Sequence, residues 1–129
     1  MKSTEATLQR PEGARILDAP YVVTDINASM THLMNEEGWE QTDCNGITLF
    51  KTENLTTVLI CMHTGSRIGE NSIDGTVTLQ IVEGEVELTA EEDVLTLHTG
   101  QIVMLHHHVT HSILATEETM MLLTNHVCC

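Results

Sequence analysis

Aromatic side chains are scarce in this chain of 129 residues. They make up 2% of the sequence, and Tyr21, Trp39 and Phe50 are the complete set. The core must therefore be built from Leu, Ile, Val and Met. Single-stranded nucleic acids are bound largely by stacking on aromatic rings, and sugar stacking has the same requirement, so this scarcity argues against both ligands.

Basic residues are also few. Five lysine and arginine residues stand against nineteen aspartate and glutamate residues, which gives a formal net charge of −14. The negative electrostatic potential that this net charge produces repels nucleic-acid phosphates and anionic lipid headgroups. We therefore expect neither nucleic-acid binding nor membrane association, and we interpret the acidity as a solubilising surface charge.

Long apolar runs are missing as well. The N-terminal MKSTEATLQRPEG lacks the apolar stretch of a secretory signal, and no segment approaches the roughly 18 apolar residues of a spanning helix. These features predict a cytoplasmic protein. Its four cysteines match no zinc-ligand spacing and are expected as thiols, with Cys61 in the core. We interpret the vicinal Cys128 and Cys129 as a mobile tail, with a redox or soft-metal site as the alternative.

One helical segment precedes the strand-forming part of the chain. Met30 and Leu33 recur at helical spacing, which indicates a short helix that is capped by Asn27 or Ser29 and extends to Glu37. Eight short runs rich in β-branched and aliphatic residues follow, separated by glycine and acidic turns. These runs are 47–50, 56–63, 77–83, 85–89, 94–98, 102–105, 111–115 and 120–124. Short, evenly spaced strands predict an all-β sandwich or barrel.

The length fits one domain. We expect residues 1–129 to fold as a single unit, in which residues 1–46 provide an extended arm and the helix. Residues 47–126 are expected to form the β-barrel. Pro11, Gly13 and Pro20 interrupt any helix in the arm.

Two segments carry regularly spaced motif positions. GSRIGENSIDGTVTLQIVEG, from Gly65 to Gly84, and GQIVMLHHHVTHSILA, which begins at Gly100, fit without a gap the spacing of two family motifs. The first motif is glycine, His-x-His, glutamate, glycine, and the second is glycine, Pro-x-Gly, histidine, asparagine. With this spacing the chain resembles the cupin superfamily, and residues 49–124 look like small single-domain bacterial cupins of unassigned function. The resemblance implies a double-stranded β-helix, a jelly-roll-like barrel.

The resemblance also implies where a divalent metal would bind, and this sequence departs from that pattern. The four ligand positions of a typical cupin read Asn71, Ile73, Val77 and His111 here. Ile73 and Val77 cannot bind a metal, and an asparagine oxygen is a poor ligand beside imidazole or carboxylate. We therefore expect the fold without the usual metal site. We expect these four residues to line an apolar barrel cavity that binds a small molecule.

Clustered histidines suggest a rebuilt metal site as an alternative. His106 and His108 replace the proline and glycine of the second motif, and in an extended segment both point to one side, close to His111. With His63 they could bind Zn, Ni, Fe or Mn. Adventitious metal binding and polar loop histidines without a role are the other interpretations. The motif glycine often has a positive φ, which histidine adopts only at a cost, so we expect this loop to differ.

His63 ends an apolar strand and shares a face with Cys61 and Leu59. It could face the barrel interior as a metal ligand, or it could be a hydrogen-bonded structural residue.

Three functional hypotheses follow. The first is a small-molecule-binding cupin without the usual metal. The second is a metal-dependent enzyme of the oxygenase or isomerase type that uses the rebuilt histidine site. The third is a structural or regulatory homodimer, since cupins of this size commonly pair through sheet edges and open edges must be covered. Fold alone does not choose among them, because cupins host many functions.

Overall fold

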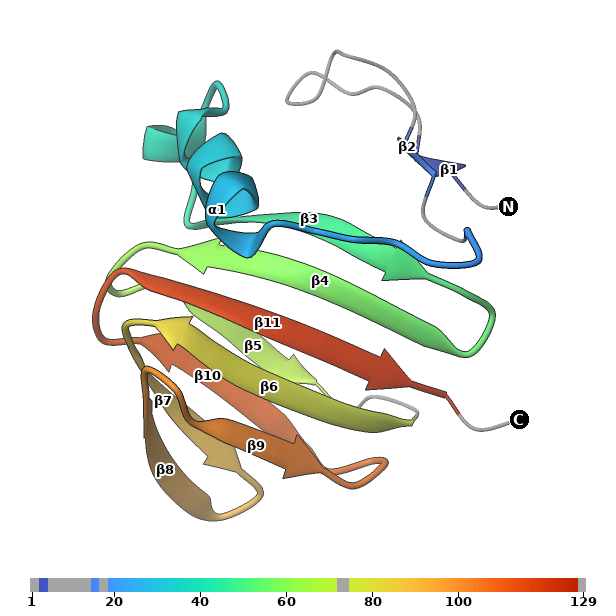
Figure 1. Cartoon of the computed structure of the whole chain (residues 1–129). Helices are drawn as coiled ribbons and strands as arrows, with labels where there is room; N and C mark the ends of the chain where they lie inside the picture. The colour runs from blue at the N-terminus through green and yellow to red at the C-terminus, as the bar shows by residue number, and fades with distance from the viewer. Residues whose placement is uncertain (1–2, 5–14, 17–18, 72–74, 128–129) are drawn as a thin grey trace.

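The computed structural model describes residues 3–4, 15–16, 19–71 and 75–127. The predicted all-β fold is confirmed, because the described strands form two large antiparallel sheets and a two-stranded ribbon, with one α-helix against them (Figure 1). The elements are β1 (Ser3–Thr4), β2 (Arg15–Ile16), α1 (Ile26–Asn35), the 3-10 turn η1 (Trp39–Gln41), β3 (Cys44–Lys51), β4 (Leu55–Met62), β5 (Arg67–Asn71), β6 (Thr76–Glu83), β7 (Glu85–Ala90), β8 (Asp93–His98), β9 (Ile102–Leu105), β10 (His111–Ala115) and β11 (Thr119–His126).

The two large sheets face each other. The first has the strand order β3-β4-β11-β6-β9 and the second has the order β5-β10-β7-β8. After β4 the chain passes repeatedly from one sheet to the other, which is the jelly-roll-like path expected of a double-stranded β-helix. The eight predicted strands correspond to β3, β4 and β6 to β11. The prediction missed β5, whose short polar sequence RIGEN carries little strand signal.

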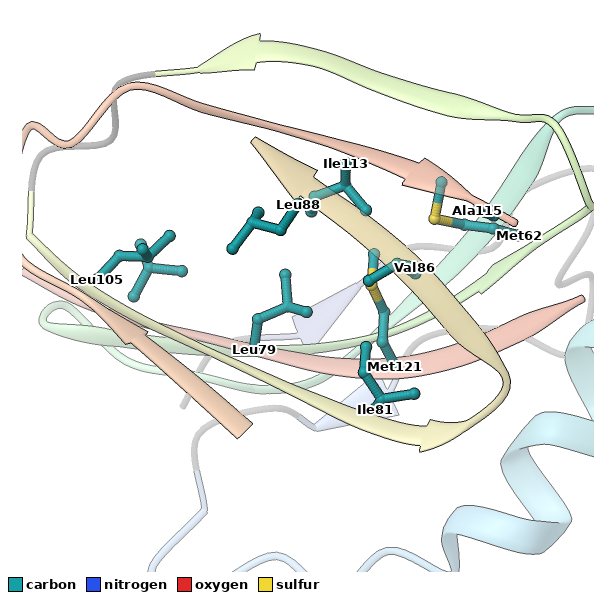
Figure 2. Packing of buried hydrophobic residues seen from close by; sticks show 10 residues of the cluster. Met62, Leu79, Ile81, Val86, Leu88, Leu105, Ile113, Ala115 and Met121 are labelled. Atoms are coloured by element: carbon teal, nitrogen blue, oxygen red, sulfur yellow. The ribbon is translucent and has the colours of Figure 1, made fainter. Parts of the chain in front are cut away.

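The main core fills the space between the two sheets. Alternate residues of each strand point inward, and they are almost all aliphatic, as the scarcity of aromatics requires. Figure 2 shows these side chains converging from both sheets, with Leu105 at one end and Met62 beside Ala115 at the other. The cluster consists of Met62, Val77, Leu79, Ile81, Val86, Leu88, Leu105, Ile113, Ala115 and Met121.

A second apolar cluster lies on the outer face of the five-stranded sheet, where α1 and η1 cover it (Figure 1). Leu33 of the helix is fully buried there, as is Cys61, which confirms the prediction that Cys61 belongs to the core. Burial raises the pKa of the Cys61 thiol to about 11, so it stays protonated. Because the middle of this sheet is buried on both faces, β4 and β11 read as continuous apolar runs.

The N-cap of α1 lies two residues before Asn27, the earlier of the two predicted cap residues. Asp25 is the N-cap residue, and its side chain accepts a hydrogen bond of 3.0 Å from the backbone N–H of Ala28. The prediction of Asn27 or Ser29 is therefore corrected, since both lie within the helix. No helix in the described ranges is long and apolar enough to cross a membrane.

Candidate functional site

His111 opens β10 at one end of the barrel. Its backbone pairs with Asn71 of β5 on one side and with Ala90 of β7 on the other. The side chain is 3% exposed, and it follows the same alternation as Ile113, which lies in the main core. β9 ends at Leu105, and a loop of residues 106–110 leads from it into His111.

The ring of His111 is held in one tautomer. Its Nδ1 lies 3.0 Å from the carbonyl oxygen of Val109. A carbonyl accepts hydrogen bonds and cannot donate them, so Nδ1 carries the proton. In the neutral ring the lone pair then lies on Nε2.

A cavity of about 590 Å³ adjoins His111, between the β7–β8 turn and the start of β10. Its lining is polar, because it combines three hydroxyl side chains with three carboxylates and the one histidine. The lining residues are Thr89, Glu91, Glu92, Asp93, Thr110, His111 and Ser112. The Glu91 N–H donates to the Thr110 carbonyl at 2.9 Å, which ties the turn to the loop that enters β10.

The structure does not gather the four predicted cavity residues in this space. Val77 is 2% exposed and packs within the main core beside the other aliphatic side chains. Asn71 is a backbone partner of His111, and Ile73 lies outside the described residues. His111 lines the described cavity and Val77 does not, and the described walls are polar rather than apolar.

The loop with three consecutive histidines keeps the backbone shape that the family glycine would give. His108 has φ +65°, in the left-handed region, so the expected change of conformation at this position is not seen. For a residue with a side chain this conformation costs about 1–2 kcal/mol. The rings of His107 and His108 stack with their centroids 3.8 Å apart, and both side chains, like that of His106, are exposed.

His63 lies on the other face of the five-stranded sheet from the barrel interior. Its ring stacks on Trp39 with centroids 3.9 Å apart, and both ring nitrogens have partners there. The hypothesis that His63 faces inward beside His111 is therefore corrected. The same-face rule grouped His63 with Cys61 as the sequence predicted, but that face packs against the helical layer.

The residues at the cupin metal positions do not fit a divalent metal. Val77 offers no donor atom, and His111 brings a single imidazole nitrogen. Among the residues that the structure describes, no group of three or more His, Cys, Asp or Glu side chains could hold an ion.

Sequence reasoning missed most of the cavity lining. Thr110 and Ser112 flank His111 in the sequence, so the sequence alone could have indicated that they lie near His111. Of the predicted acidic turn, residues 91–93, Glu91 and Glu92 form the turn and Asp93 begins β8. The approach of these residues to His111 depends on the pairing of β7 with β10. β7 and β10 are separated by about twenty residues in the sequence, so their pairing cannot be predicted from a local sequence pattern.

No family model and no curated protein matches the sequence. Solved structures do match the fold. A conserved protein of unknown function from Streptococcus pyogenes is 21% identical with a TM-score of 0.71, covering 88% of this chain and 94% of that one. A cupin superfamily protein from Desulfitobacterium hafniense is 19% identical with a TM-score of 0.65, covering 66% and 78%.

A cupin-2 domain protein from Shewanella frigidimarina is 14% identical with a TM-score of 0.64, covering 81% of this chain and 94% of that one. At these identities the likeness concerns the arrangement of the strands and not the site residues. The strand order, the inward-facing aliphatic core and these structural matches agree, and they show that the chain has the cupin fold.

Proposed function

We propose that this protein binds a small molecule without negative charge in the cavity beside His111. The observation that carries the proposal is the cavity itself, whose lining gathers three hydroxyl side chains, three carboxylates and His111 at the β7–β8 turn and the start of β10. The cavity volume of about 590 Å³ lies in the usual range for small-molecule sites.

The charge of the lining selects the ligand class. Among the described residues, three carboxylates and no lysine or arginine line the cavity, and the whole chain carries a formal charge of −14. A carboxylate or phosphate ligand would be repelled, whereas an ammonium group would be attracted and could donate hydrogen bonds to these acceptors. The ligand class is therefore a compact amine or a neutral molecule rich in hydrogen-bond donors.

A matched series of probes tests this class. Cyclohexylamine, cyclohexanol and cyclohexanecarboxylate share one ring and differ in charge. Isothermal titration calorimetry is expected to rank their affinities in that order. His111→Asn keeps a donor near the Val109 carbonyl but removes Nε2, and we expect it to weaken amine binding about tenfold, because one ligand hydrogen bond is lost. His111→Gln, which retains a group near the Nε2 position, should lose less.

His98→Asn provides the control, because His98 is an exposed histidine outside the cavity lining. Its affinity for cyclohexylamine should equal that of the native protein. The proposal is wrong if none of the probes binds, if the carboxylate binds as tightly as the amine, or if His111→Asn binds the amine normally.

A second proposal concerns self-association, which the exposed edge of the molecule favours. In the described ranges β8 and β9 each pair on one side, and each ends one of the two sheets. Their exposed apolar side chains are Val94, Leu95, Ile102 and Met104. β9 reads IVML and carries no charge, although charged residues are the usual protection of an open edge. We propose that a second copy of the chain covers this edge as a homodimer.

Met104→Glu tests the dimer, because Met104 is 65% exposed and a carboxylate there would meet its own copy across the interface. Light scattering at micromolar concentration should give twice 14.3 kDa for the native chain and 14.3 kDa for the variant. Met34→Glu, on the exposed side of α1, is the control and should remain dimeric. A native mass of 14.3 kDa, or a dimeric Met104→Glu, contradicts the proposal.

A further inference from the structure

His63 joins three segments that are distant in the sequence. It follows β4, its Nε2 lies 2.8 Å from the carbonyl oxygen of Trp39 in η1, and its Nδ1 lies 2.8 Å from Oε1 of Glu118 in the turn between β10 and β11. The other carboxylate oxygen of Glu118 accepts a hydrogen bond from the N–H of Thr64. The ring also stacks on the Trp39 indole. One side chain therefore ties the helical layer to the rim of the barrel.

Both partners of the His63 ring are acceptors. The Trp39 carbonyl cannot donate a hydrogen, and neither can the ionised carboxylate of Glu118. Neutral imidazole has one N–H and can satisfy one of these contacts, whereas imidazolium has two and satisfies both. Only the protonated ring of His63 can therefore donate a hydrogen bond to both acceptors at once.

The charges around His63 act in the same direction. Glu118 from the β10–β11 turn and Asp43 from the segment before β3 are the charged groups that act on it, and both are negative. The hydrogen bond to the Trp39 carbonyl, followed by the bond to Glu118, raises the pKa of His63, against a smaller opposing effect of burial. The N–H of Thr64 and the bond to His63 lower the pKa of Glu118.

We propose that His63 is a pH-operated latch, which fastens η1 to the turn between β10 and β11 while the ring is protonated and loosens η1 when the ring loses its proton. This device is independent of the ligand cavity, because His63 contacts η1 outside the five-stranded sheet, whereas His111 belongs to β10 of the four-stranded sheet. It gives η1 two states that differ by a single proton.

The pH window follows from the two shifts. The pKa of His63 is raised in the folded state, so its stabilisation is complete below the unfolded value near 6.5 and is lost as pH rises through the folded value. The pKa of Glu118 is lowered, so its contribution is present above the unfolded value near 4.5 and is lost as pH falls through the folded value. The latch is therefore closed between the lowered pKa of Glu118 and the raised pKa of His63, and it opens as pH rises through the raised pKa of His63.

Trp39 reports on the latch directly, because it is the only tryptophan in the chain and imidazolium quenches the fluorescence of an indole stacked on it. We expect emission to rise with pH, with a midpoint above 6.5. His63→Gln keeps a donor for the Trp39 carbonyl without a titrating proton and should abolish this transition. Glu118→Gln should lower its midpoint, because the negative charge beside the ring is removed.

His98→Gln is the matched control, since His98 also contacts a glutamate, Glu85 at 3.0 Å, but is 60% exposed and far along the chain from Trp39. The transition should be unchanged in this variant. Amide hydrogen exchange at Trp39, Gln41 and Thr42, whose N–H groups bond within η1 and its flanks, should become several-fold faster in His63→Gln than in the native protein at about pH 6. The proposal fails if native Trp39 emission shows no transition above 6.5, if the transition persists in His63→Gln, or if exchange in η1 is unchanged.

Discussion

Gly84→Ala is expected to lower the free energy of unfolding by about 3–5 kcal/mol, a large part of the stability of a domain of this size. Gly84 joins β6 to β7 with φ +106°, a conformation that L side chains rarely adopt. A Cβ at this position would also overlap the Glu118 carbonyl oxygen and approach Thr119 Oγ1 to 2.7 Å. Backbone strain and steric overlap therefore both contribute to the loss of stability in Gly84→Ala.

The obstacle at Gly84 cannot move away. The Thr119 Oγ1 lies 3.0 Å from the carbonyl oxygen of Glu85 and 2.8 Å from that of Glu117, which share its one hydrogen, and it accepts a hydrogen bond from the N–H of Glu85, so it is fixed by the turn that it occupies. Urea unfolding followed by circular dichroism measures the loss of stability.

Gly100→Ala separates the two contributions. Gly100 has φ +88°, but an added Cβ there meets nothing within 4 Å. We expect this control to lose about 1–2 kcal/mol, from backbone strain alone. If Gly84→Ala costs no more than Gly100→Ala, the close approach to Thr119 is not a stabilising feature of the fold.

Leu88→Ala is expected to lower the free energy of unfolding by about 3 kcal/mol, because it removes a fully buried side chain from the main core and leaves a cavity. Figure 2 shows Leu88 among the side chains between the sheets. The core has few aromatic groups that could collapse into the space, so relaxation should recover little of the loss. Urea unfolding again gives the difference.

Leu95→Ala is the matched control for Leu88. Leu95 is the direct cross-strand partner of Leu88 in β8, but it is 40% exposed. In the Met104→Glu background, where no second copy is expected to cover β8, its truncation should cost less than about 1 kcal/mol, because less apolar surface is buried. Equal losses from Leu88→Ala and Leu95→Ala in that background would contradict the prediction.

Local patterns in the sequence predicted most of the strands. β7 and β8 alternate clearly in EVEL and VLTL, and each has a turn at both ends, so their bounds agree with prediction within about two residues. β5 was missed because its sequence, RIGEN, has neither alternation nor a run of β-branched residues. Its strand conformation depends on pairing with β10, which is a tertiary contact.

The direction of His63 could not be predicted for a different reason. Apolar residues fill both faces of β4 and β11, since the main core covers one face and the helical layer covers the other. In such a strand hydrophobicity does not distinguish the inner face from the outer one. The sequence grouped His63 with Cys61 and Leu59 correctly, but it contained no signal for which side the group would face.

The sequence by itself determined an aliphatic core, the glycine-marked turns, the positions of most strands along the chain and the absence of the usual cupin ligands at Asn71, Ile73 and Val77. These are properties of residue type and short-range spacing, which are fixed before folding. Only the tertiary structure decided that His111 adjoins a polar cavity and that His63 meets Trp39 and Glu118. Both sites combine residues from strands and turns far apart in the chain, and such contacts follow from strand pairing and sheet packing rather than from local pattern.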